Sequence, residues 1–183
     1  MSVEFANYSM SHEIKYEQPW YDWCVFASAD RTTIDRIASV QYHLHPSFPN
    51  PIRMTTDKKH RFPLITDGWR EFSIGIHLTF TDGTSESTSY WLRLSQDNWP
   101  KKAAPAQFAT AEHQAVYGVL TEGPYRWRKL KTLIAKTGLP EDSVRQLLKD
   151  LENEDLARRA LVPSIDGQEM WAATLLVGVL PHL

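Results

Sequence analysis

The sequence predicts two domains of different class, an all-β antiparallel sandwich over residues 14–98 and a small α+β winged helix over residues 109–183. Three observations lead to this prediction. Hydrophobic residues recur with a period of two in the first half and of 3.6 after residue 110. Between the halves, "NWPKKAAPAQFAT" is rich in proline, lysine and alanine, a composition typical of linkers. We therefore place a linker at residues 99–108.

The clearest strand is "EFSIGIHLTF", in which Phe72, Ile74, Ile76, Leu78 and Phe80 alternate with small or polar residues. "TDGT" follows it and contains Asp-Gly, a strong hairpin signal. The chain then returns as "TSESTSYWLRL". "WCVFAS", "DRIASVQYHLH" and "FPLI" are predicted as shorter strands. Several short strands separated by turn-rich loops favour an antiparallel sandwich.

Three helices are predicted after the linker. "TAEHQAVYGVLTEG" opens with Thr110 as N-cap, "YRWRKLKTLIAKTG" ends at Gly138, and "LPEDSVRQLLKDLENEDL" has an apolar stripe at helical spacing. "ARRALVPS" and "QEMWAATL" then predict two strands around a tight turn at "IDG". Three helices and a hairpin are the winged-helix arrangement, with "TGLP" as the turn of a helix-turn-helix.

Composition narrows the function classes. The 183 residues carry a net charge of -2, so no overall basic field attracts nucleic acid. Cys24 is the single cysteine, which excludes an intramolecular disulfide and fits a reducing cytosol. The N-terminus lacks the features of a signal peptide, and no run approaches the ~18 apolar residues of a membrane span. We expect a cytoplasmic protein with no membrane partner.

The stretch "HLHPSFPNP" invites a metal or catalytic interpretation. His43 and His45 share one face of a strand, but zinc needs a third protein ligand, for which His60 and His77 are the nearby candidates. No His-Glu-x-x-His or Cys-x-x-Cys motif is present. Ser47 lacks the Gly-x-Ser-x-Gly context of a nucleophile, and no phosphate-binding loop appears. We therefore expect no metal, no cofactor and no enzyme activity.

Charge on the predicted winged helix argues against tight DNA binding. Residues 103–183 hold 9 Lys/Arg and 10 Asp/Glu, and the outward face of the third helix is mostly acidic, which complements phosphate poorly. Protein contact or dimerisation is at least as plausible as weak DNA binding. If DNA is bound, the candidate nucleic-acid contacts are the basic residues on the second helix and before the wing: Arg126, Arg128, Lys129, Lys131, Arg158 and Arg159.

Residues 14–98 strongly resemble the YEATS domain. "YDWCVF", "SVQYHLHPSFPNPIR" and "TDGWREFSIGIHLTF" follow one another in the order and spacing of that family. The resemblance implies an immunoglobulin-like sandwich that recognises acylated lysine, here in a prokaryotic relative. The helical half lies outside the resemblance.

The resemblance also implies a binding site. By motif position, His45, Ser47 and Phe48 come from one loop, and Gly68 and Trp69 from a second. Phe48 and Trp69 would sandwich the acyl group, Ser47 and a backbone N–H would bind its amide, and His45 would shape the wall. Arg70 stands where family members have small residues, and Trp20 is a candidate for a further aromatic wall residue.

Two function hypotheses follow from these residues. The first is a non-enzymatic module that binds an acetylated or crotonylated lysine of a protein or peptide, coupled to a winged helix for protein or nucleic-acid contact. The second is a DNA-binding transcriptional regulator in which the sandwich serves for dimerisation or sensing. A purely structural role is the alternative, in which Phe48 and Trp69 are core residues that close the end of the sandwich.

Overall fold

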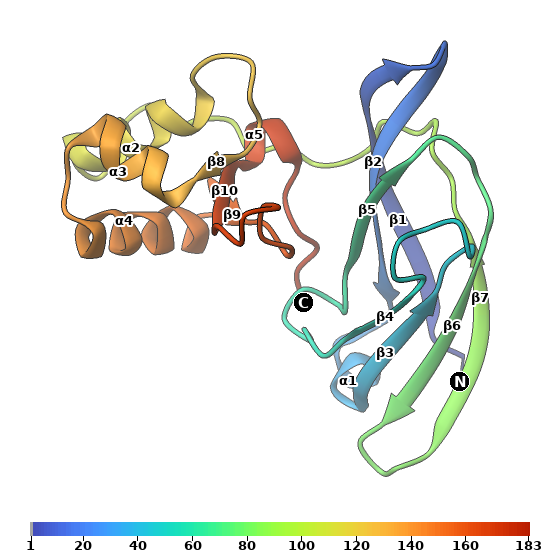
Figure 1. Cartoon of the computed structure of the whole chain (residues 1–183). Coiled ribbons are helices and arrows are strands. Elements are labelled where there is room, and N and C mark those ends of the chain that lie inside the picture. Colours follow the sequence, from blue (N-terminus) through green and yellow to red (C-terminus); the bar gives the residue numbers. More distant parts are fainter. Residues whose placement is uncertain (1) are drawn as a thin grey trace. The chain divides into compact units, whose positions relative to one another are not determined.

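The computed structural model describes residues 2–183 and divides into two compact units (Figure 1). The first contains the residues up to Trp99 together with Leu180–Leu183, and the second contains Pro100–Val179. The first unit therefore extends beyond the predicted range 14–98 at its N-terminal end. The last four residues, expected to belong with the helices, pack with the first unit instead.

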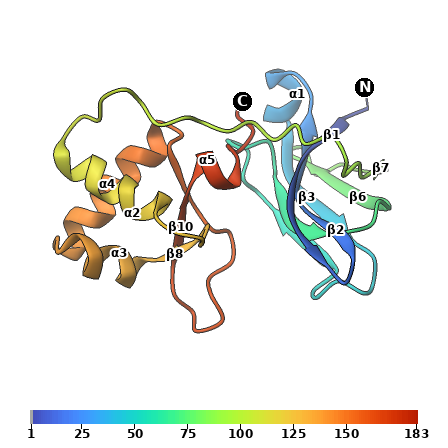
Figure 2. The ribbon, with the colours of Figure 1, turned by 90° about the horizontal axis from the view of Figure 1, so that it is seen from above.

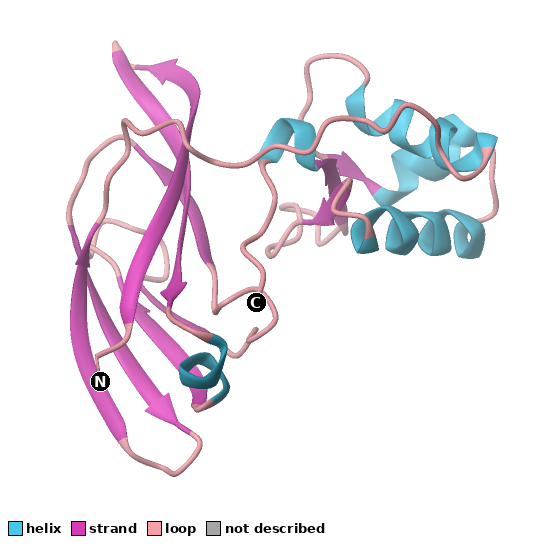
Figure 3. Ribbon diagram, turned by 180° about the vertical axis from the view of Figure 1, so that it is seen from behind, coloured by secondary structure: helices cyan, strands magenta, loops and turns pink. Residues whose placement is uncertain are grey.

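The first unit consists of two antiparallel sheets (Figure 3). One has the order β1-β2-β5, formed by Glu4–Lys15, Gln18–Ser28 and Leu64–Gly68. The other has the order β4-β3-β6-β7, formed by Ile52–Thr55, Ile37–His43, Ser73–Phe80 and Ser85–Trp91. A short helix, α1 (Arg31–Asp35), precedes β3. The predicted antiparallel β-sandwich is confirmed for this unit.

The core lies between the sheets and follows the predicted alternation. Ile74, Ile76 and Leu78 of β6 are buried, whereas the residues between them are not. Trp23 of β2 and Tyr42 of β3 are fully buried in the same cluster. The Tyr42 hydroxyl donates to the Phe62 carbonyl at 2.6 Å, which satisfies its one polar group inside the core.

Strand β1 was not predicted from the sequence. Two of its buried residues, Asn7 and Ser9, are polar, so the hydrophobic pattern is interrupted. The amide of Asn7 donates to the Arg93 carbonyl at 2.7 Å and accepts from the Tyr90 hydroxyl at 2.7 Å. These bonds join β1 to the end of the opposite sheet. Strand β1 is thus stabilised in part by hydrogen bonds to residues distant in sequence, and it lacks the apolar alternation from which a strand is predicted.

The outer face of sheet β1-β2-β5 carries a smaller apolar cluster of Met10, Cys24, Phe26 and Trp99. Trp99 was expected to begin the linker, but its backbone N–H donates to the Ser9 carbonyl at 3.2 Å and its side chain is buried. Cys24 is a buried free thiol in this cluster, in agreement with its expected role as an apolar core residue.

The second unit combines three helices with a three-stranded sheet (Figure 2). The helices are α2 (Ala111–Thr121), α3 (Leu130–Thr137) and α4 (Glu141–Asn153). The sheet has the order β8-β10-β9, formed by Arg128–Lys129, Met170–Ala173 and Ala157–Arg159, and a final turn, α5, spans Thr174–Val177. Thr110 caps α2 as predicted, since its side chain accepts from the His113 N–H at 3.2 Å.

The second predicted helix begins later than expected. It starts at Leu130, because Arg128 and Lys129 pair with β10 as strand β8. It ends as predicted at Gly138, which adopts the left-handed conformation with φ of 68°. The predicted hairpin is also shorter, since β9 and β10 are separated by residues 160–169, whose turn is closed by a bond from the Gly167 N–H to the Ser164 carbonyl.

Within residues 2–183, none of the helices is both long enough and apolar enough to cross a membrane.

Candidate functional site

Backbone hydrogen bonds and prolines restrict the conformation of the loop between β3 and β4. The Leu44 N–H donates to the Pro51 carbonyl at 2.7 Å, and the Phe48 N–H donates to the His45 carbonyl at 3.0 Å. Prolines at positions 46, 49 and 51 restrict the backbone further. The loop therefore presents Ser47 and Phe48 in a defined conformation, which limits the entropy lost when a ligand binds.

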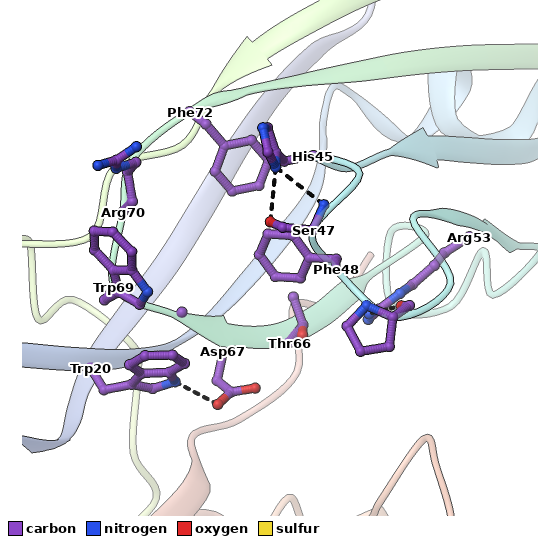
Figure 4. Close-up of a pocket in the computed structure, with 12 residues that line it drawn as sticks. Trp20, His45, Ser47, Phe48, Arg53, Thr66, Asp67, Trp69, Arg70 and Phe72 are labelled. Atoms are coloured by element: carbon purple, nitrogen blue, oxygen red, sulfur yellow. Dashed lines mark hydrogen bonds between the residues drawn. The ribbon is translucent and has the colours of Figure 1, made fainter. Parts of the chain in front are cut away.

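This loop faces the end of β5 and the residues that follow it across a cavity of about 540 Å³. Figure 4 shows its lining as sticks. All seven residues proposed from the sequence for acyl-lysine binding lie on this one cavity: Trp20, His45, Ser47, Phe48, Gly68, Trp69 and Arg70. Five further lining residues were not proposed: Pro49, Arg53, Thr66, Asp67 and Phe72.

Aromatic contacts hold Phe48 in place. Its ring lies 5.5 Å from that of Phe72, tilted by 37°, and 6.3 Å from that of Trp23 in an edge-to-face arrangement. Trp23 contacts Phe72 in the same manner at 6.2 Å. Phe48 is thus half-buried at the margin of the core, and one of its neighbours is a fully buried tryptophan. Trp23 and Phe72 are supporting residues that sequence reasoning assigned only to strands.

Trp69, by contrast, is not part of the core. Its side chain is 40% exposed, and the guanidinium of Arg70 lies 4.7 Å from its ring centroid. A cation on one ring face stabilises the aromatic system in a fixed position. The core-plug alternative therefore fails for Trp69 and holds only in part for Phe48.

Gly68 leaves space at the floor of the cavity. A Cβ at this position would lie 3.6 Å from the Phe48 ring and 3.6 Å from the indole nitrogen of Trp23. That nitrogen is buried and has no hydrogen-bond partner among the described residues. The absence of a side chain at position 68 therefore opens the approach to the backbone between Phe48 and Trp69.

His45 and Ser47 form a local polar pair. The backbone N–H of Ser47 donates to Nδ1 of His45 at 3.2 Å, and the Ser47 hydroxyl lies 2.8 Å from the same nitrogen. Because Nδ1 accepts from the backbone, we assign the imidazole proton to Nε2, and the hydroxyl then donates to Nδ1. The lone pairs of the Ser47 oxygen remain available to accept a hydrogen bond from a ligand.

Trp20 and Asp67 build a second wall on the other face of β5. The Trp20 indole donates to the Asp67 carboxylate at 2.6 Å, and the Lys15 ammonium lies 4.9 Å from the Trp20 ring centroid. Successive residues of a strand point to opposite faces. Thr66 and Gly68 therefore face the interior of the sandwich, whereas Asp67 faces outward toward Trp20.

Arg53 is the most buried cation of the cavity wall. Its Nε donates to the Asn50 carbonyl at 3.2 Å and its Nη2 to the Pro49 carbonyl at 3.1 Å. Burial lowers the pKa of the guanidinium from its ordinary value, and the more distant charge of Asp67 raises it in part. The guanidinium remains charged near neutral pH in any case.

Two of the six candidate nucleic-acid contacts are buried. Arg128 is buried and donates to the carbonyls of Val119 and Glu122. Arg158 is buried as well and donates to the Gly178 and Val177 carbonyls at 3.0 and 2.8 Å. These two guanidinium groups are thus engaged with backbone carbonyls inside the second unit, which argues against their proposed role as phosphate contacts.

The remaining basic candidates differ in their environment. Lys129 pairs with Asp166 at 2.7 Å, and Lys131 lies 3.9 Å from the same carboxylate. Arg159 is exposed, and Arg126 is partly buried. Only Lys131 lies on α3, because the helix begins at Leu130. Of the four basic residues expected on that helix, Arg126, Arg128 and Lys129 precede it.

Three of the histidines considered for a metal have other hydrogen-bond partners. His43 contacts Gln41, His77 contacts Ser87, and His60 contacts Asp57. Across residues 2–183, no group of three or more His, Cys, Asp or Glu side chains is arranged to hold a metal ion.

Part of the chain is similar to known proteins. Over 77 residues the chain is 30% identical to transcription initiation factor TFIID subunit 14 of Schizosaccharomyces pombe, a match that covers 42% of this chain. The chain spans only 31% of that relative's length.

Among solved structures, the chain matches the Yaf9 YEATS domain recognizing an H3K122suc peptide, with 22% identity and a TM-score of 0.41, covering 53% of this chain and 80% of that one. A structure of the yeast AF-9 homolog protein Yaf9 has 20% identity and a TM-score of 0.40, covering 51% and 72%. Residues 21–93, which include Ser47, Phe48, Gly68 and Trp69, match the family model of the prokaryotic YEATS domain, so the resemblance inferred from the sequence is confirmed over that segment.

Proposed function

We propose that the first unit is a non-enzymatic recognition module that binds the side chain of an acylated lysine between Phe48 and Trp69. One observation carries the proposal: the residues transferred by motif position from two separate loops all line a single cavity with aromatic walls. Such a cavity, with few and well-placed polar groups, is the common form of a small-ligand site.

The chemistry of the walls suits an acyl amide. Acylation removes the ammonium charge of lysine, which lowers the free energy needed to enter an apolar slot. Stacking of a planar group on an aromatic ring contributes about 0.5–1.5 kcal/mol beyond burial. Among neutral acyl groups, crotonyl therefore binds more tightly than acetyl, because its conjugated chain offers more planar surface to both rings.

Two polar groups are available for the amide. The Ser47 oxygen accepts from the ligand N–H, since its own proton is directed to His45. Strand β5 pairs with β2 on one side and is the edge of its sheet on the other. Its open edge beside Gly68 offers backbone donors for the acyl carbonyl.

The test is a titration of the full chain with lysine peptides that differ only in the ε-amino group. Crotonylated and acetylated peptides should bind with micromolar or weaker affinity, as expected for a single side chain of small area. The unmodified peptide should not bind. Tryptophan fluorescence and backbone NMR shifts of residues 45–48 and 66–70 report the site. Equal binding of modified and unmodified peptides would refute the proposal.

We infer that the second unit is a winged helix that makes protein contacts and binds DNA weakly at most. The burial of Arg128 and Arg158 supports this inference, since it removes two of the six candidate phosphate contacts. The alternative, a DNA-binding regulator with a sensory sandwich, requires salt-dependent duplex binding. Nanomolar binding to duplex DNA at physiological salt would favour that alternative.

A further inference from the structure

In strands β4, β3, β6 and β7, the outward-pointing residues include no aspartate, glutamate, lysine or arginine. Successive residues of a strand point to opposite faces, and those that point away from the core form four rows across this sheet (Figure 1). The rows are Trp91 and Ser73; Ser89, Gly75, His43 and Ile52; Ser87, His77, Gln41 and Met54; and Ser85, Thr79 and Ser39. The four charged types make up 23% of the chain, so a whole face without them is unusual for a surface that only contacts water. Charged residues are depleted at the cores of protein interfaces.

The large apolar side chains of this outer face lie at its opposite margins. Ile52 and Met54 belong to the edge strand β4 and are 57% and 69% exposed. Trp91 belongs to the other edge strand, β7, and is 56% exposed. Aromatic residues and methionine are enriched in protein interfaces. The outer face therefore has two apolar margins and a polar centre.

The polar centre satisfies part of its own hydrogen-bonding capacity. The His77 imidazole lies 3.0 Å from the Ser87 hydroxyl, and the His43 imidazole lies 3.3 Å from the Gln41 side-chain oxygen. A polar group that already has a partner is removed from water at a lower cost than one without. A hollow of about 490 Å³ surrounds Gly75, which has no side chain. A second flat surface can therefore approach this centre closely.

We propose that the outer face of this sheet packs against the same face of a second copy of the chain. Most protein oligomers are symmetric, and in a two-fold dimer one surface meets itself. A two-fold axis parallel to the strands, between β3 and β6, sets β4 of one copy over β7 of the other. Met54 then faces Ser87 of the second copy, and Ile52 faces Ser89. The proposal rests on none of the residues of the acyl-lysine slot, so either can fail without the other.

This axis matches the shape of the face to itself. Trp91 lies one row beyond Ser89, about 6.6 Å along the strand, so its indole reaches Ile52 of the second copy. His43 of one copy lies over the hollow at Gly75 of the other. An axis perpendicular to the strands would instead set Trp91 against Ser85 of the second copy, without an apolar neighbour. The parallel axis is therefore the arrangement that covers the apolar residues at both margins.

The size of the face determines the expected affinity. From the spacings within and between strands, the rows cover on the order of 400 Å² of sheet in each copy. A standard interface buries about 800 Å² of each partner. We therefore expect a reversible dimer with a dissociation constant in the micromolar range or weaker.

A simpler explanation for the same residues is a face that only contacts water. Antiparallel sheets commonly have one solvated face, and serine, threonine and glutamine are ordinary residues there. In that case the chain would remain a monomer at every concentration. The two explanations thus differ in a quantity that can be measured on the unmodified protein.

The experiment is sedimentation velocity of the full chain over a concentration range from about 5 to 500 µM, which spans the affinity expected for a small interface. The wild-type chain should show a monomer–dimer equilibrium. Met54→Glu and Ser87→Lys should each weaken it roughly tenfold or more, because each places an unpaired charge in the contact. The double variant Met54→Glu/Ser87→Lys should restore dimerisation, since the carboxylate of one copy then faces the ammonium of the other at both symmetric contacts.

The rescue by the double variant can only arise between copies. Within one chain, β3 and β6 separate positions 54 and 87, a distance of about 14 Å, so the two new charges cannot pair with each other. The matched control is Ile14→Glu/Ser95→Lys, which makes the same chemical changes at exposed positions outside the face. Its dissociation constant should equal that of the wild-type chain.

Three outcomes would overturn the proposal. The first is a wild-type chain that remains monomeric over the whole range. The second is a dimer that neither single substitution weakens, which would assign the contact to another surface. The third is a double variant that dimerises no better than the single ones, which would exclude the parallel axis. If Met54→Glu does not fold, as judged by urea unfolding, Ile52→Glu with Ser89→Lys tests the neighbouring row in the same way.

Discussion

The two aromatic walls of the slot differ in how much of the fold depends on them. Phe48 packs on Phe72 and the buried Trp23, so its removal disturbs the core. Trp69 is 40% exposed, and its ring is in contact with the guanidinium of Arg70. Ligand binding and stability can therefore be separated at Trp69 and not at Phe48.

We expect Trp69→Ala to abolish binding of acylated peptides while changing the free energy of unfolding by roughly 0.5 kcal/mol or less, as is usual for exposed positions. Ser47→Ala should weaken binding by about 1 kcal/mol, through loss of one hydrogen bond to the ligand amide. Peptide titration and urea unfolding of the same samples provide the two measurements. Retained binding in Trp69→Ala would show that the ring is not a wall of the site.

At the scale of elements, neighbouring residues of β9 have opposite roles. Arg158 is buried, and it donates to the Val177 and Gly178 carbonyls at the end of α5 while its guanidinium lies 5.1 Å from the Trp127 ring centroid. Arg159 is exposed beside it. In the sequence they form one basic pair, and only the tertiary structure distinguishes them.

Arg158→Ala should lower the free energy of unfolding of the second unit by about 2–3 kcal/mol, because it leaves two buried carbonyls without donors. Arg159→Ala is the matched control and should change it by roughly 0.5 kcal/mol or less. Urea unfolding, followed by circular dichroism at the helix band, measures both. Equal effects of the two substitutions would contradict the structural role assigned to Arg158.

These cases show what the sequence could and could not predict. Strands such as β6 and helices such as α4 follow from hydrophobic periodicity, because their partners only need to be apolar. Strand β1 and the burial of Arg128 and Arg158 depend on polar partners distant in sequence: Asn7 requires Arg93 and Tyr90, and Arg128 requires Val119. Periodicity carries no information on such pairs.

The residues of the candidate site likewise fall into some that the sequence could predict and some that it could not. Motif order identified five of the residues that lie on this cavity, because their positions belong to two loops of defined placement, whereas Trp20 and Arg70 were candidates outside the matched motif positions. Arg53 was quoted within a motif, and Phe72 was assigned to a strand, but neither was assigned to the site. Recognising them requires the register that pairs Arg53 with Tyr42 and the ring contacts of Phe72 with Phe48. Strand register depends on which face is buried and on turn geometry, and the polar alternation of β4 together with the long loop before it left that register undetermined from the sequence.

At the scale of the whole molecule, the chain passes between the units twice, after Trp99 and after Val179, and the first passage leads into a short exposed segment bounded by anchored residues. Trp99 is buried in the outer cluster of the first unit, and Phe108 packs against the core of the second. Between them, Lys101 and Lys102 are exposed and lie outside any helix or strand. Such segments are preferred sites of proteolytic cleavage, because the backbone can enter a protease without loss of buried contacts.

Limited trypsin digestion should therefore cut first after Lys101 or Lys102 and release fragments that begin near residues 102 and 103. Lys59 is one competing site, since it is also exposed and outside the helices and strands. Its loop is held by bonds from the Phe62 N–H to the Asp57 carbonyl at 2.7 Å and from the Leu183 N–H to the Lys59 carbonyl at 3.3 Å. These bonds must open before cleavage, so cleavage at Lys59 is slowed in proportion to the small fraction of molecules in which the loop is open.

Mass spectrometry of early time points identifies the first cut. The variant Lys101→Gln/Lys102→Gln should lose that cut and leave the others unchanged, whereas initial cleavage at Lys59 in the wild-type chain would show that the linker is the better protected of the two segments.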